Sequence, residues 1–402
     1  MMLQDLQYND TQGSANLLQS VAGFMNWYFR CRKPLVQDNV LIANGVTTLL
    51  NSLAFNIADE GSAVLMPTPS YGMFSHDVVT RNSLHLVPVP CDDIVEERFR
   101  CRQGAPGSPR TLGDTQSNGS RTAAVLLANP ENPLGRCYDQ EVLLEVSRFC
   151  EENRMHLVVD EIYAATAFSR HHSMLGLDLG SNAENVHVLW GMSKDFGCGG
   201  LRLGFLATYN AKLHAAMRTL SMFGWVSAWS AAVASAILDD RRFLQNTYFP
   251  TLERRLDTRR KQVLARLTQL DVPFVAPEAG FFVFVDLSRW LDKDAAQTRR
   301  GSAELELLSR LMAHRVFLEP GQAFFSARPG WFRLNFGNDD ETVNLGLRKL
   351  AAFLQSVTFR ESIDDAEGNG FEKRGQTPPR PDETTRFQRW RRTLCFGPGD
   401  DA

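Results

Sequence analysis

Short apolar runs alternate with segments of helical periodicity through the first half of this chain. Seven of these runs lie at Leu41–Ala43, Ala63–Met66, Leu84–Val89, Ala123–Ala128, Leu157–Val159, Val186–Trp190 and Leu203–Ala207. Continuous apolar strands separated by helices are typical of a mostly parallel sheet that helices cover on both faces. The sequence therefore predicts an α/β fold in which a ligand binds beyond the carboxyl ends of the strands.

The second half of the chain predicts a smaller domain and a tail. A long basic segment of helical periodicity, 243–270, is a candidate connector between two domains. Beyond it, a strand at 281–287, a helix at 304–314 and a strand at 332–335 indicate a smaller α+β unit. From about residue 356 charges and prolines increase while apolar periodicity is lost, which predicts disorder.

The overall composition excludes several classes of partner. The chain has 402 residues, a formal net charge of -3 and 44% hydrophobic residues, so we expect neither nucleic acid nor a membrane surface as partner. The seven cysteines are scattered and odd in number, and no signal-peptide pattern opens the chain, so we expect reduced thiols and a cytoplasmic location. No metal site is expected, since His171 and His172 are adjacent and cannot share one helical face. Residues 104–121 are rich in glycine, serine and proline and predict a mobile surface insertion.

One lysine follows a predicted buried strand in the run VLWGMSKDFGCGGLRLG, residues 188–204. Lys194 comes directly after a turn of small residues that includes Ser193. A lysine at the end of a buried strand loses solvation, which lowers its pKa and makes its amine a nucleophile. Arg202 and the glycines around it suit the binding of an anion. Two interpretations of this run stay open: a Schiff-base lysine beside a phosphate clamp, or a surface lysine in a glycine-rich turn.

A second anion site is predicted where Gly45 precedes a helix. The free N–H groups of Val46 and Thr47 and the helix dipole attract an anion, and the Thr47 hydroxyl adds a donor. A plain turn before a core helix is the alternative.

Three loops that follow strands supply groups suited to a planar ring. Asp160 ends an apolar strand, where a buried carboxylate needs a cation such as a protonated pyridine nitrogen. Tyr163 lies close enough along the chain to reach an oxygen of the same ligand. Tyr71, in a loop fixed by prolines, can stack on a heteroaromatic ring, and the amide of Asn132 can donate to a phenolate-type oxygen. The alternatives are a helix-capping aspartate, a tyrosine packed under its loop and an ordinary Asn-Pro turn.

Arg333 lies in a predicted strand of the second half, where a guanidinium that points into a site binds an α-carboxylate in bidentate fashion. A surface arginine at a strand edge is the alternative. Together, the candidates supply a Schiff-base lysine, a carboxylate for a ring nitrogen, donors to a ring oxygen, a stacking ring, a phosphate cradle and a carboxylate clamp. This set fits one cofactor, pyridoxal 5′-phosphate (PLP), acting on an amino acid.

Five motifs resemble those of one enzyme family: SKDFGCGGLRLG, ANPENPLG, VVDEIYA, PTPSYG and PGWFRLNF. They are similar to fold-type I PLP enzymes, class I and II aminotransferases, and within them to the branch that resembles 1-aminocyclopropane-1-carboxylate (ACC) synthase. The resemblance covers about residues 10–355. It implies a large PLP-binding domain, 31–249, with a mostly parallel seven-stranded sheet between helices. It further implies a smaller α+β domain formed by 1–30 and 250–357, a disordered tail at 358–402, and a homodimer acting on an amino acid or keto acid.

The same resemblance gives each candidate residue a role. It implies that Lys194 is the internal aldimine lysine, that Asp160 is the partner of the pyridine nitrogen, and that Tyr71 binds the ring face. The ring oxygen would be bound by Asn132 and Tyr163, and the phosphate by Val46, Thr47, Ser193 and Arg202. The substrate carboxylate would be bound by Arg333, with Asn132 beside it. Lys194, Asp160 and Tyr163 are the catalytic residues in this scheme.

Three departures from the family pattern bear on activity. Gly191 stands where the family usually has a serine that contacts phosphate, and Thr11 stands where it has a tyrosine that crosses the dimer interface. The chain starts so close to Thr11 that the family's N-terminal arm, which in ACC synthases carries a glutamate near the substrate, is expected to be missing. These changes predict a weaker hold on the phosphate and argue against ACC synthesis itself.

Three hypotheses for function follow. In the first, the protein is an aminotransferase in which Lys194 forms the Schiff base and moves a proton as general acid and base. In the second, it is a PLP lyase that performs ACC synthase-like γ-elimination or C–S bond cleavage. In the third, it is a catalytically impaired descendant that keeps the fold as a binding protein. A Rossmann dehydrogenase is not supported, because no strand–G-x-G-x-x-G–helix pattern is present.

Overall fold

The computed structural model describes residues 7–91, 121–168, 171–292 and 303–367. The described residues up to 354 form one compact unit, and every contact discussed below lies within it. The predicted insertion at 104–121 lies outside the described residues, apart from its last residue.

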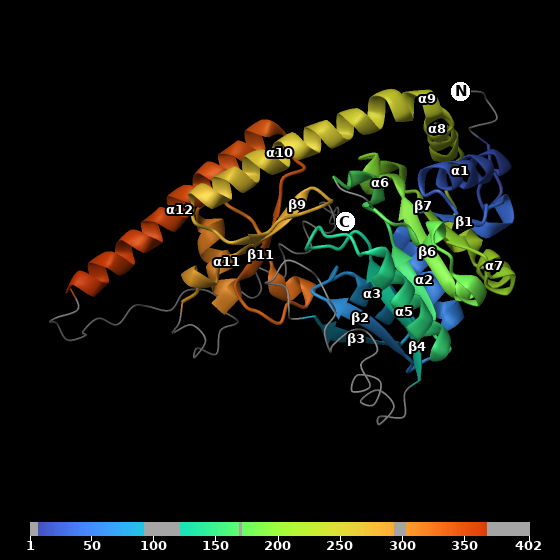
Figure 1. Cartoon of the computed structure of the whole chain (residues 1–402), viewed down its shortest axis with the longest axis horizontal. Coiled ribbons are helices and arrows are strands. Elements are labelled where there is room, and N and C mark those ends of the chain that lie inside the picture. The colour runs from blue at the N-terminus through green and yellow to red at the C-terminus, as the bar shows by residue number, and fades with distance from the viewer. Residues whose placement is uncertain (1–6, 92–120, 169–170, 293–302, 368–402) are drawn as a thin grey trace, which may run out of the picture. The chain divides into compact units, whose positions relative to one another are not determined.

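A seven-stranded sheet is the centre of the fold (Figure 1). Its strands are β1 (Val40–Ala43), β2 (Ala63–Thr68), β3 (His85–Pro90), β4 (Thr122–Ala128), β5 (His156–Asp160), β6 (Val186–Gly191) and β7 (Gly204–Thr208). They are arranged in the order β1-β7-β6-β5-β4-β2-β3. Only β7 pairs antiparallel, with β1 and with β6, and the remaining neighbours are parallel. The predicted fold class, with its mostly parallel seven-stranded sheet, is confirmed.

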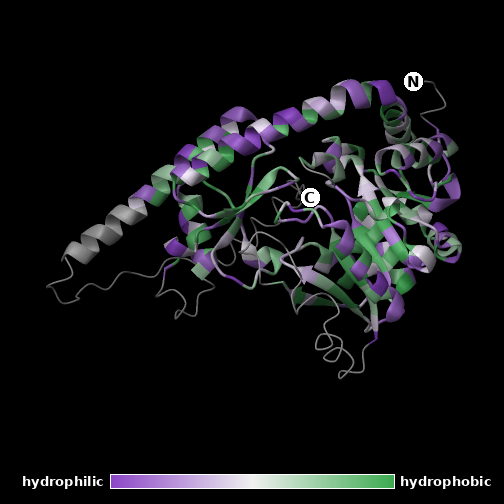
Figure 2. Ribbon diagram, in the orientation of Figure 1, coloured by the Kyte–Doolittle hydropathy of each residue, from purple (hydrophilic) through white to green (hydrophobic). Residues whose placement is uncertain are grey.

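Helices cover both faces of this sheet because successive strand residues point to opposite sides. One face is packed by α1 (Ala15–Tyr28), α5 (Gln140–Glu152) and α8 (Ala228–Asp239), and the other by α2 (Val46–Ile57), α3 (Phe74–Val79) and α7 (Ala211–Arg218). In β6, for example, Val188 and Trp190 belong to the first core while Leu189 belongs to the second. Figure 2 shows the consequence, since the strands of this sheet are coloured hydrophobic along most of their length.

The first helix corrects one predicted domain assignment. Residues 1–30 were assigned to the smaller domain, but α1 packs in the core of the large sheet. Phe24 stacks on Trp190 of β6 with ring centroids 4.7 Å apart and an interplanar angle of 12°. The apolar stripe of α1 is wide enough to bury four large side chains, and the large sheet offers the apolar surface that these side chains need. The other domain boundaries remain predictions.

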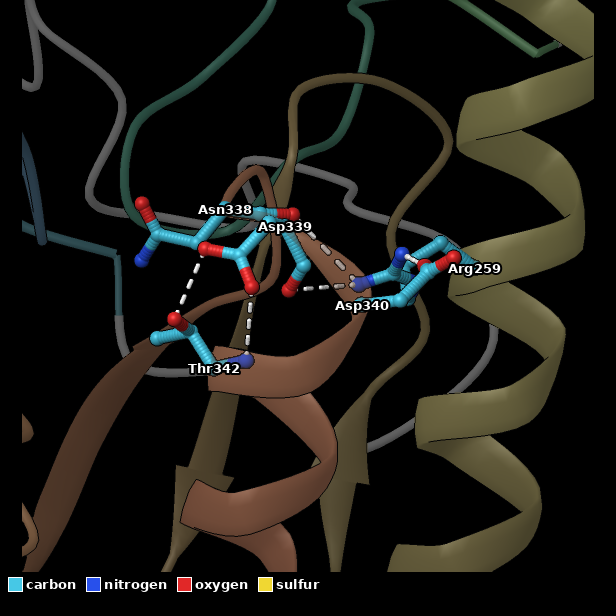
Figure 3. Close-up of polar contacts among 5 residues, drawn as sticks. All are labelled: Arg259, Asn338, Asp339, Asp340 and Thr342. Carbon is cyan, nitrogen blue, oxygen red and sulfur yellow. Dashed lines mark hydrogen bonds and ion pairs between the residues drawn. The ribbon is translucent and has the colours of Figure 1, made fainter.

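A long helical segment follows α8. It consists of α9 (Arg241–Phe243), a five-residue π-turn (Leu244–Tyr248) and α10 (Phe249–Gln269), which together cover nearly the residues of the predicted connector. Arg259 of α10 pairs with Asp340 and donates to the carbonyls of Asn338 and Asp339 at 3.4 Å (Figure 3). α10 is thereby joined to the start of α12 (Asp340–Glu367).

The first turn of α12 is held by an aspartate. Asp339 accepts from the N–H of Thr342 at 2.8 Å and from its hydroxyl at 2.7 Å, as Figure 3 shows. The helix runs to Glu367, so residues 358–367 are helical where the sequence predicted disorder. Residues 368–402 of the predicted tail lie outside the described part of the chain. No helix among the described residues is both long and apolar enough to span a membrane.

A second, antiparallel sheet of four strands is formed by the later part of the chain. Its strands are β8 (Phe274–Val275), β9 (Phe282–Asp286), β10 (Glu319–Pro320) and β11 (Trp331–Asn335), in the order β10-β11-β9-β8. α11 (Ala303–Ala313) precedes β10. The strands predicted at 281–287 and 332–335 and the helix at 304–314 correspond to β9, β11 and α11.

Candidate active site

The carboxyl ends of β5 and β6 bring two candidate residues to one edge of the large sheet. β5 and β6 are parallel neighbours, and Asp160, the last residue of β5, pairs opposite Leu189. Lys194 lies in the short helix α6 (Met192–Asp195), which begins directly after β6. Because parallel strands end at the same edge of the sheet, Asp160 and Lys194 both lie at that edge. With Tyr163 they form what we call the lysine half of the site.

Asp160 is a buried carboxyl whose pKa lies near neutral pH. Its Oδ1 accepts the N–H of Ile162 at 3.1 Å. Burial raises the pKa of Asp160 to about 7, and the nearby Asp77 carboxyl adds to this rise. The Ile162 N–H and the Lys194 amine oppose it. A carboxyl in this state gains stability from a cation placed beside it, such as a protonated ring nitrogen.

Lys194 differs in one respect from the prediction. Its side chain is exposed in the structure rather than enclosed, with its amine 5.8 Å from the ring centroid of Tyr163. The protein around the amine still lowers the pKa of Lys194 by desolvation, and the Arg333 guanidinium lowers it further. Asp160 and Glu319 oppose this shift. The predicted position therefore holds an amine with a lowered pKa, while its burial is only partial.

Tyr71 and Tyr163 differ in how deeply they are buried. Tyr163 is buried, with its ring edge-on to Phe281 and Phe282, and burial raises its pKa. Tyr71 is half-buried, and burial, with Asp77 and Asp160 adding to the effect, raises its pKa to about 12. Both phenols therefore stay protonated near neutral pH and can donate a hydrogen bond.

The start of α2 forms a cradle with the beginning of β7. Gly45 has a φ of 125°, and a Cβ built there would lie 2.6 Å from Nη2 of Arg202. A Cβ at Gly204 would lie 2.4 Å from the backbone nitrogen of Val46. Glycine at both positions lets Arg202 and the first N–H groups of α2 come together, where the helix dipole favours an anion. Arg202 itself is exposed, and its guanidinium donates to the carbonyl of Asn44 at 3.3 Å.

Two details of this cradle depart from expectation. The hydroxyl of Thr47, predicted as a donor to the anion, instead bonds to Asp77, a buried carboxyl whose pKa burial raises to about 6. Only the backbone of Thr47 remains as a donor to an anion. At Gly191, a Cβ would lie 2.7 Å from the carbonyl oxygen of Leu203, so the close approach of the two chain segments leaves no room for the family's serine. Ser193, half-buried in α6, is the hydroxyl residue nearest in sequence to Lys194.

Arg333 occupies the second sheet and forms, with Glu319, what we call the arginine half of the site. Its Nη1 donates to Oδ1 of Asn132 at 2.7 Å, and its Nη2 pairs with Glu319. The guanidinium carbon lies 5.3 Å from the ring centroid of Phe282 and 4.8 Å from that of Phe324. Asn132 therefore joins the two halves, because it is buried in the loop after β4 while its amide oxygen is held by Arg333.

The loop that carries Tyr71 also joins the two halves. The N–H of Ser70 donates to the carbonyl of Phe324 at 2.9 Å. A Cβ at Gly72 would lie 1.8 Å from the carbonyl oxygen of Ala323, so no other residue fits at this approach. The PTPSYG motif is thus explained in part by the contact that it makes with the turn after β10.

Three further acidic residues belong to the site region and were missed from the sequence. Glu319 contacts Arg333, Asp77 contacts Thr47, and Asp195, directly after Lys194, is fully buried. The sequence offered a signal for Asp195, because it is an acid beside the candidate lysine in a turn of otherwise apolar residues and glycines. An acid buried in such a turn needs hydrogen-bond donors from within the protein. Glu319 and Asp77 carried none, because their partners lie on other elements of the fold.

The chain as a whole matches a known family. The family described as aminotransferase class I and II matches residues 3–350. The chain belongs to the class I and II aminotransferases. Within this family, it is 32% identical over 354 residues to the human 1-aminocyclopropane-1-carboxylate synthase-like protein 1. The match covers 87% of this chain and 70% of that protein. It is also 32% identical over 357 residues to 1-aminocyclopropane-1-carboxylate synthase 2 of Oryza sativa subsp. japonica, covering 87% and 72% respectively.

A solved structure supports the same fold. The aspartate aminotransferase from Thermus thermophilus with maleate has a TM-score of 0.73 to this aminotransferase-family chain at 21% sequence identity. The match covers 87% of this chain and 84% of that chain. The resemblance to fold-type I PLP enzymes of the ACC synthase-like branch is confirmed.

PLP is the cofactor of this family member. The described residues fit it: Asp160 offers a buried carboxyl with a pKa near neutrality, and Lys194 offers an amine with a lowered pKa at the same sheet edge. Glycine at 45 and 204 lets the Arg202 guanidinium and the first backbone N–H groups of α2 come together at the start of a helix, as a phosphate requires.

Proposed function

We propose that this protein is a PLP-dependent aminotransferase that acts on an α-amino acid. The observation that carries the proposal is the arrangement of three groups: Asp160 ends β5, Lys194 follows the neighbouring parallel strand β6, and Arg333 of the second sheet donates to Asn132 in the loop after β4, the next strand. This arrangement supports an amine, a carboxyl for the ring nitrogen and a guanidinium for a substrate carboxylate acting on one small molecule. PLP, when bound, supplies an electron sink for the bonds at the substrate α-carbon.

The proposed roles follow from what each group can do. Lys194 would hold the cofactor through its amine and would move a proton to and from the substrate α-carbon. Asp160 would keep a proton on the ring nitrogen, and Tyr163 would donate a hydrogen bond to the ring oxygen. Arg333 donates to the amide oxygen of Asn132, so the amide N–H groups of Asn132 are the atoms that would donate to the ring oxygen.

The remaining contacts position the two anions and the ring face. The backbone N–H groups of Val46 and Thr47, with Ser193 and Arg202, hold the phosphate, and Tyr71 packs against the ring. Arg333 holds the substrate carboxylate, with Asn132 beside it.

The visible spectrum of the purified holoenzyme tests this proposal. The wild type should absorb at about 420 nm, and borohydride should remove that band and fix the cofactor to Lys194. Incubation with an amino donor should convert the cofactor to its amine form, and a keto acid should reverse the change. Lys194→Ala should lose the fixed label and lower amino transfer by a factor on the order of 10³ or more. Lys212→Ala, which removes an exposed lysine of α7, is the matched control and should leave both unchanged. A protein that never forms the amine form with any donor is not an aminotransferase.

A PLP lyase is the second candidate, favoured by the identity to proteins named as ACC synthases or ACC synthase-like. The same lysine, aspartate and arginine would serve it, but a bond beyond the α-carbon would break. Release of a thiol, a thioether or ammonia without any amine form of the cofactor would decide for the lyase.

We further propose a homodimer. Exposed apolar side chains gather along the segment 221–229, including Met222, Phe223 and Trp229, and Tyr8, which is 93% exposed, stacks on Trp225 of the same segment. The N–H of Asn44, next to the cradle, donates to the carbonyl of Gly224 at 2.8 Å, so this surface adjoins the site. A large exposed apolar surface supports a protein partner. Sedimentation of the holoenzyme as a monomer at micromolar concentration would contradict the dimer.

A further inference from the structure

The arginine that should receive the substrate already has an acidic partner. Glu319 and Arg333 lie directly opposite each other in the antiparallel pair β10–β11, so their side chains emerge on the same face. Nη2 of Arg333 pairs with Oε2 of Glu319, and Nη1 is held by Asn132. The guanidinium keeps further N–H groups for a ligand, but its positive charge is already balanced by one carboxylate.

Glu319 contacts Arg333, and its charge also acts on Lys194 and Tyr71. Desolvation and Arg333 lower the pKa of Lys194, and Glu319 is one of two carboxyls that oppose this shift. Its charge also reaches Tyr71, whose pKa is raised first by burial. Its side chain is 37% exposed, compared with 16% for Arg333, so the carboxylate lies on the more open side of the pair.

A fixed negative charge at this position distinguishes between ligands. A ligand with one carboxylate can use the free N–H groups of Arg333 while the rest of the molecule stays neutral. A ligand with a second carboxylate brings two negative charges toward a guanidinium that Glu319 already neutralises. The second carboxylate then finds no unbalanced cation at Arg333 and is repelled by Glu319.

Building on the function proposed above, we propose that Glu319 selects substrates by charge. The site accepts α-amino acids with neutral or cationic side chains and rejects those with a second carboxylate. Glu319 is thus a specificity-determining residue, and the substrate class is the amino acids other than aspartate-like and glutamate-like ones.

Two ligands of equal carbon count test this proposal on the PLP-loaded enzyme. Butyrate and succinate each have four carbons but carry one and two carboxylates, and neither has an amine that could react. Titration calorimetry should show the wild type binding butyrate ~10-fold more tightly than succinate. Glu319→Gln keeps the size of the side chain and removes its charge, so both ligands should bind more tightly to this variant, and the gain for succinate, which carries two charges, should be ~10-fold larger than the gain for butyrate.

Two further variants separate charge from other causes. Glu141→Gln removes one negative charge at an exposed position of α5 and should leave both affinities unchanged. Glu319→Ala should repeat the shift in selectivity, because the charge and not the shape of the side chain is responsible. The proposal is overturned if the wild type prefers succinate, if Glu319→Gln changes both affinities alike, or if neither ligand binds.

Failure of this inference can be told apart from failure of the proposed function. Borohydride fixation of the cofactor on Lys194 depends on the lysine half of the site and not on Glu319. A protein that fixes the cofactor but shows no charge selectivity refutes only the role of Glu319. A protein that fixes no cofactor refutes the proposed function itself.

Discussion

The lysine half and the arginine half of the site each depend on a buried carboxyl that joins two backbone segments, but the two carboxyls are used differently. In the lysine half, Oδ2 of Asp195 accepts both the indole N–H of Trp190 at 2.8 Å and the N–H of Ala165 at 3.0 Å. Its Oδ1 has no hydrogen-bond partner within the described ranges. Asp195 therefore ties the turn of Lys194 to the turn after Tyr163 through a single oxygen.

In the arginine half, Glu304 uses both of its oxygens. Oε1 accepts the N–H of Gly330 and Oε2 accepts that of Gln322, each at 2.8 Å. These donors lie at the two ends of the segment between β10 and β11, which carry Glu319 and Arg333. Glu304 therefore holds that segment closed at both ends.

The different hydrogen bonding of Asp195 and Glu304 indicates which half of the site changes its charge with pH. A buried carboxylate with one unpartnered oxygen is costly to ionise, and burial raises the pKa of Asp195 to about 8. Burial also raises the pKa of Glu304, but two backbone N–H groups oppose the rise from both oxygens. Charge near neutral pH thus changes mainly in the lysine half, where Glu161 is a second fully buried acid.

The largest expected effect concerns Glu161 and the pH dependence of stability. Burial raises its pKa from 4.5 to about 8, and its Oε2 has no partner in the described part of the chain. The native state therefore keeps a proton that the unfolded chain releases. The contribution of Glu161 to the free energy of unfolding should be largest below pH 4.5 and should fall as the pH rises to about 8. Glu161→Gln cannot ionise and should reduce this fall by on the order of 5 kcal/mol.

Urea unfolding of the apo-protein at several pH values between 4.5 and 8.5 measures this change. Glu304→Gln is the control from the arginine half and should alter the pH dependence less. Equal pH dependence in the wild type and Glu161→Gln would remove the contrast between the two halves.

The next effect concerns Asp195 as a positioning residue. Asp195→Ala removes the acceptor that fixes the turn of Lys194, and a displacement of about 1 Å costs up to ~100-fold in rate. We expect kcat to fall ~10- to 100-fold with a smaller change in KM. Asp195→Asn should retain most of the activity, because one amide oxygen can accept both N–H groups. Steady-state kinetics of the pair decide the matter, and an asparagine variant as impaired as the alanine variant would show that charge, rather than position, is what Asp195 supplies.

The smallest effect is expected from the same amide substitution in the arginine half. Glu304→Gln keeps one acceptor oxygen but replaces the other with an N–H donor, so one end of the segment between β10 and β11 is released. We expect KM for the amino acid to rise about fivefold with kcat nearly unchanged, since one hydrogen bond contributes roughly 1 kcal/mol. If Glu304→Gln lowers kcat and leaves KM alone, the arginine half is not a binding element separate from the chemistry.

The strand ends show how far the sequence alone reaches. Asp160 and Lys194 each follow a continuous apolar run, and parallel strands place such ends at one edge, so their meeting was predicted without coordinates. Arg333 was predicted as an inward arginine from a single strand, and it does lie beside Asn132. The partner Glu319 was not predicted, because only the pairing of β10 with β11 brings it opposite Arg333.

The assignments that failed also have a common cause. α1 was placed with the smaller domain, and the hydroxyl of Thr47 was given to an anion. In both cases the sequence describes a side chain correctly, as apolar or as a donor. The partner of that side chain is supplied by an element distant in the chain, such as Trp190 for α1 and Asp77 for Thr47.

The sequence by itself determined the alternating order of strands and helices, the large sheet and the residues at its carboxyl edge, because local apolar periodicity and parallel pairing are sufficient for these. Only the tertiary structure decided the contacts of the acids around those residues: Asp195 with Trp190 and Ala165, Asp77 with Thr47 and Glu319 with Arg333. Burial and long-range pairing fix the charge of such groups, and neither can be read from the neighbours of a residue along the chain.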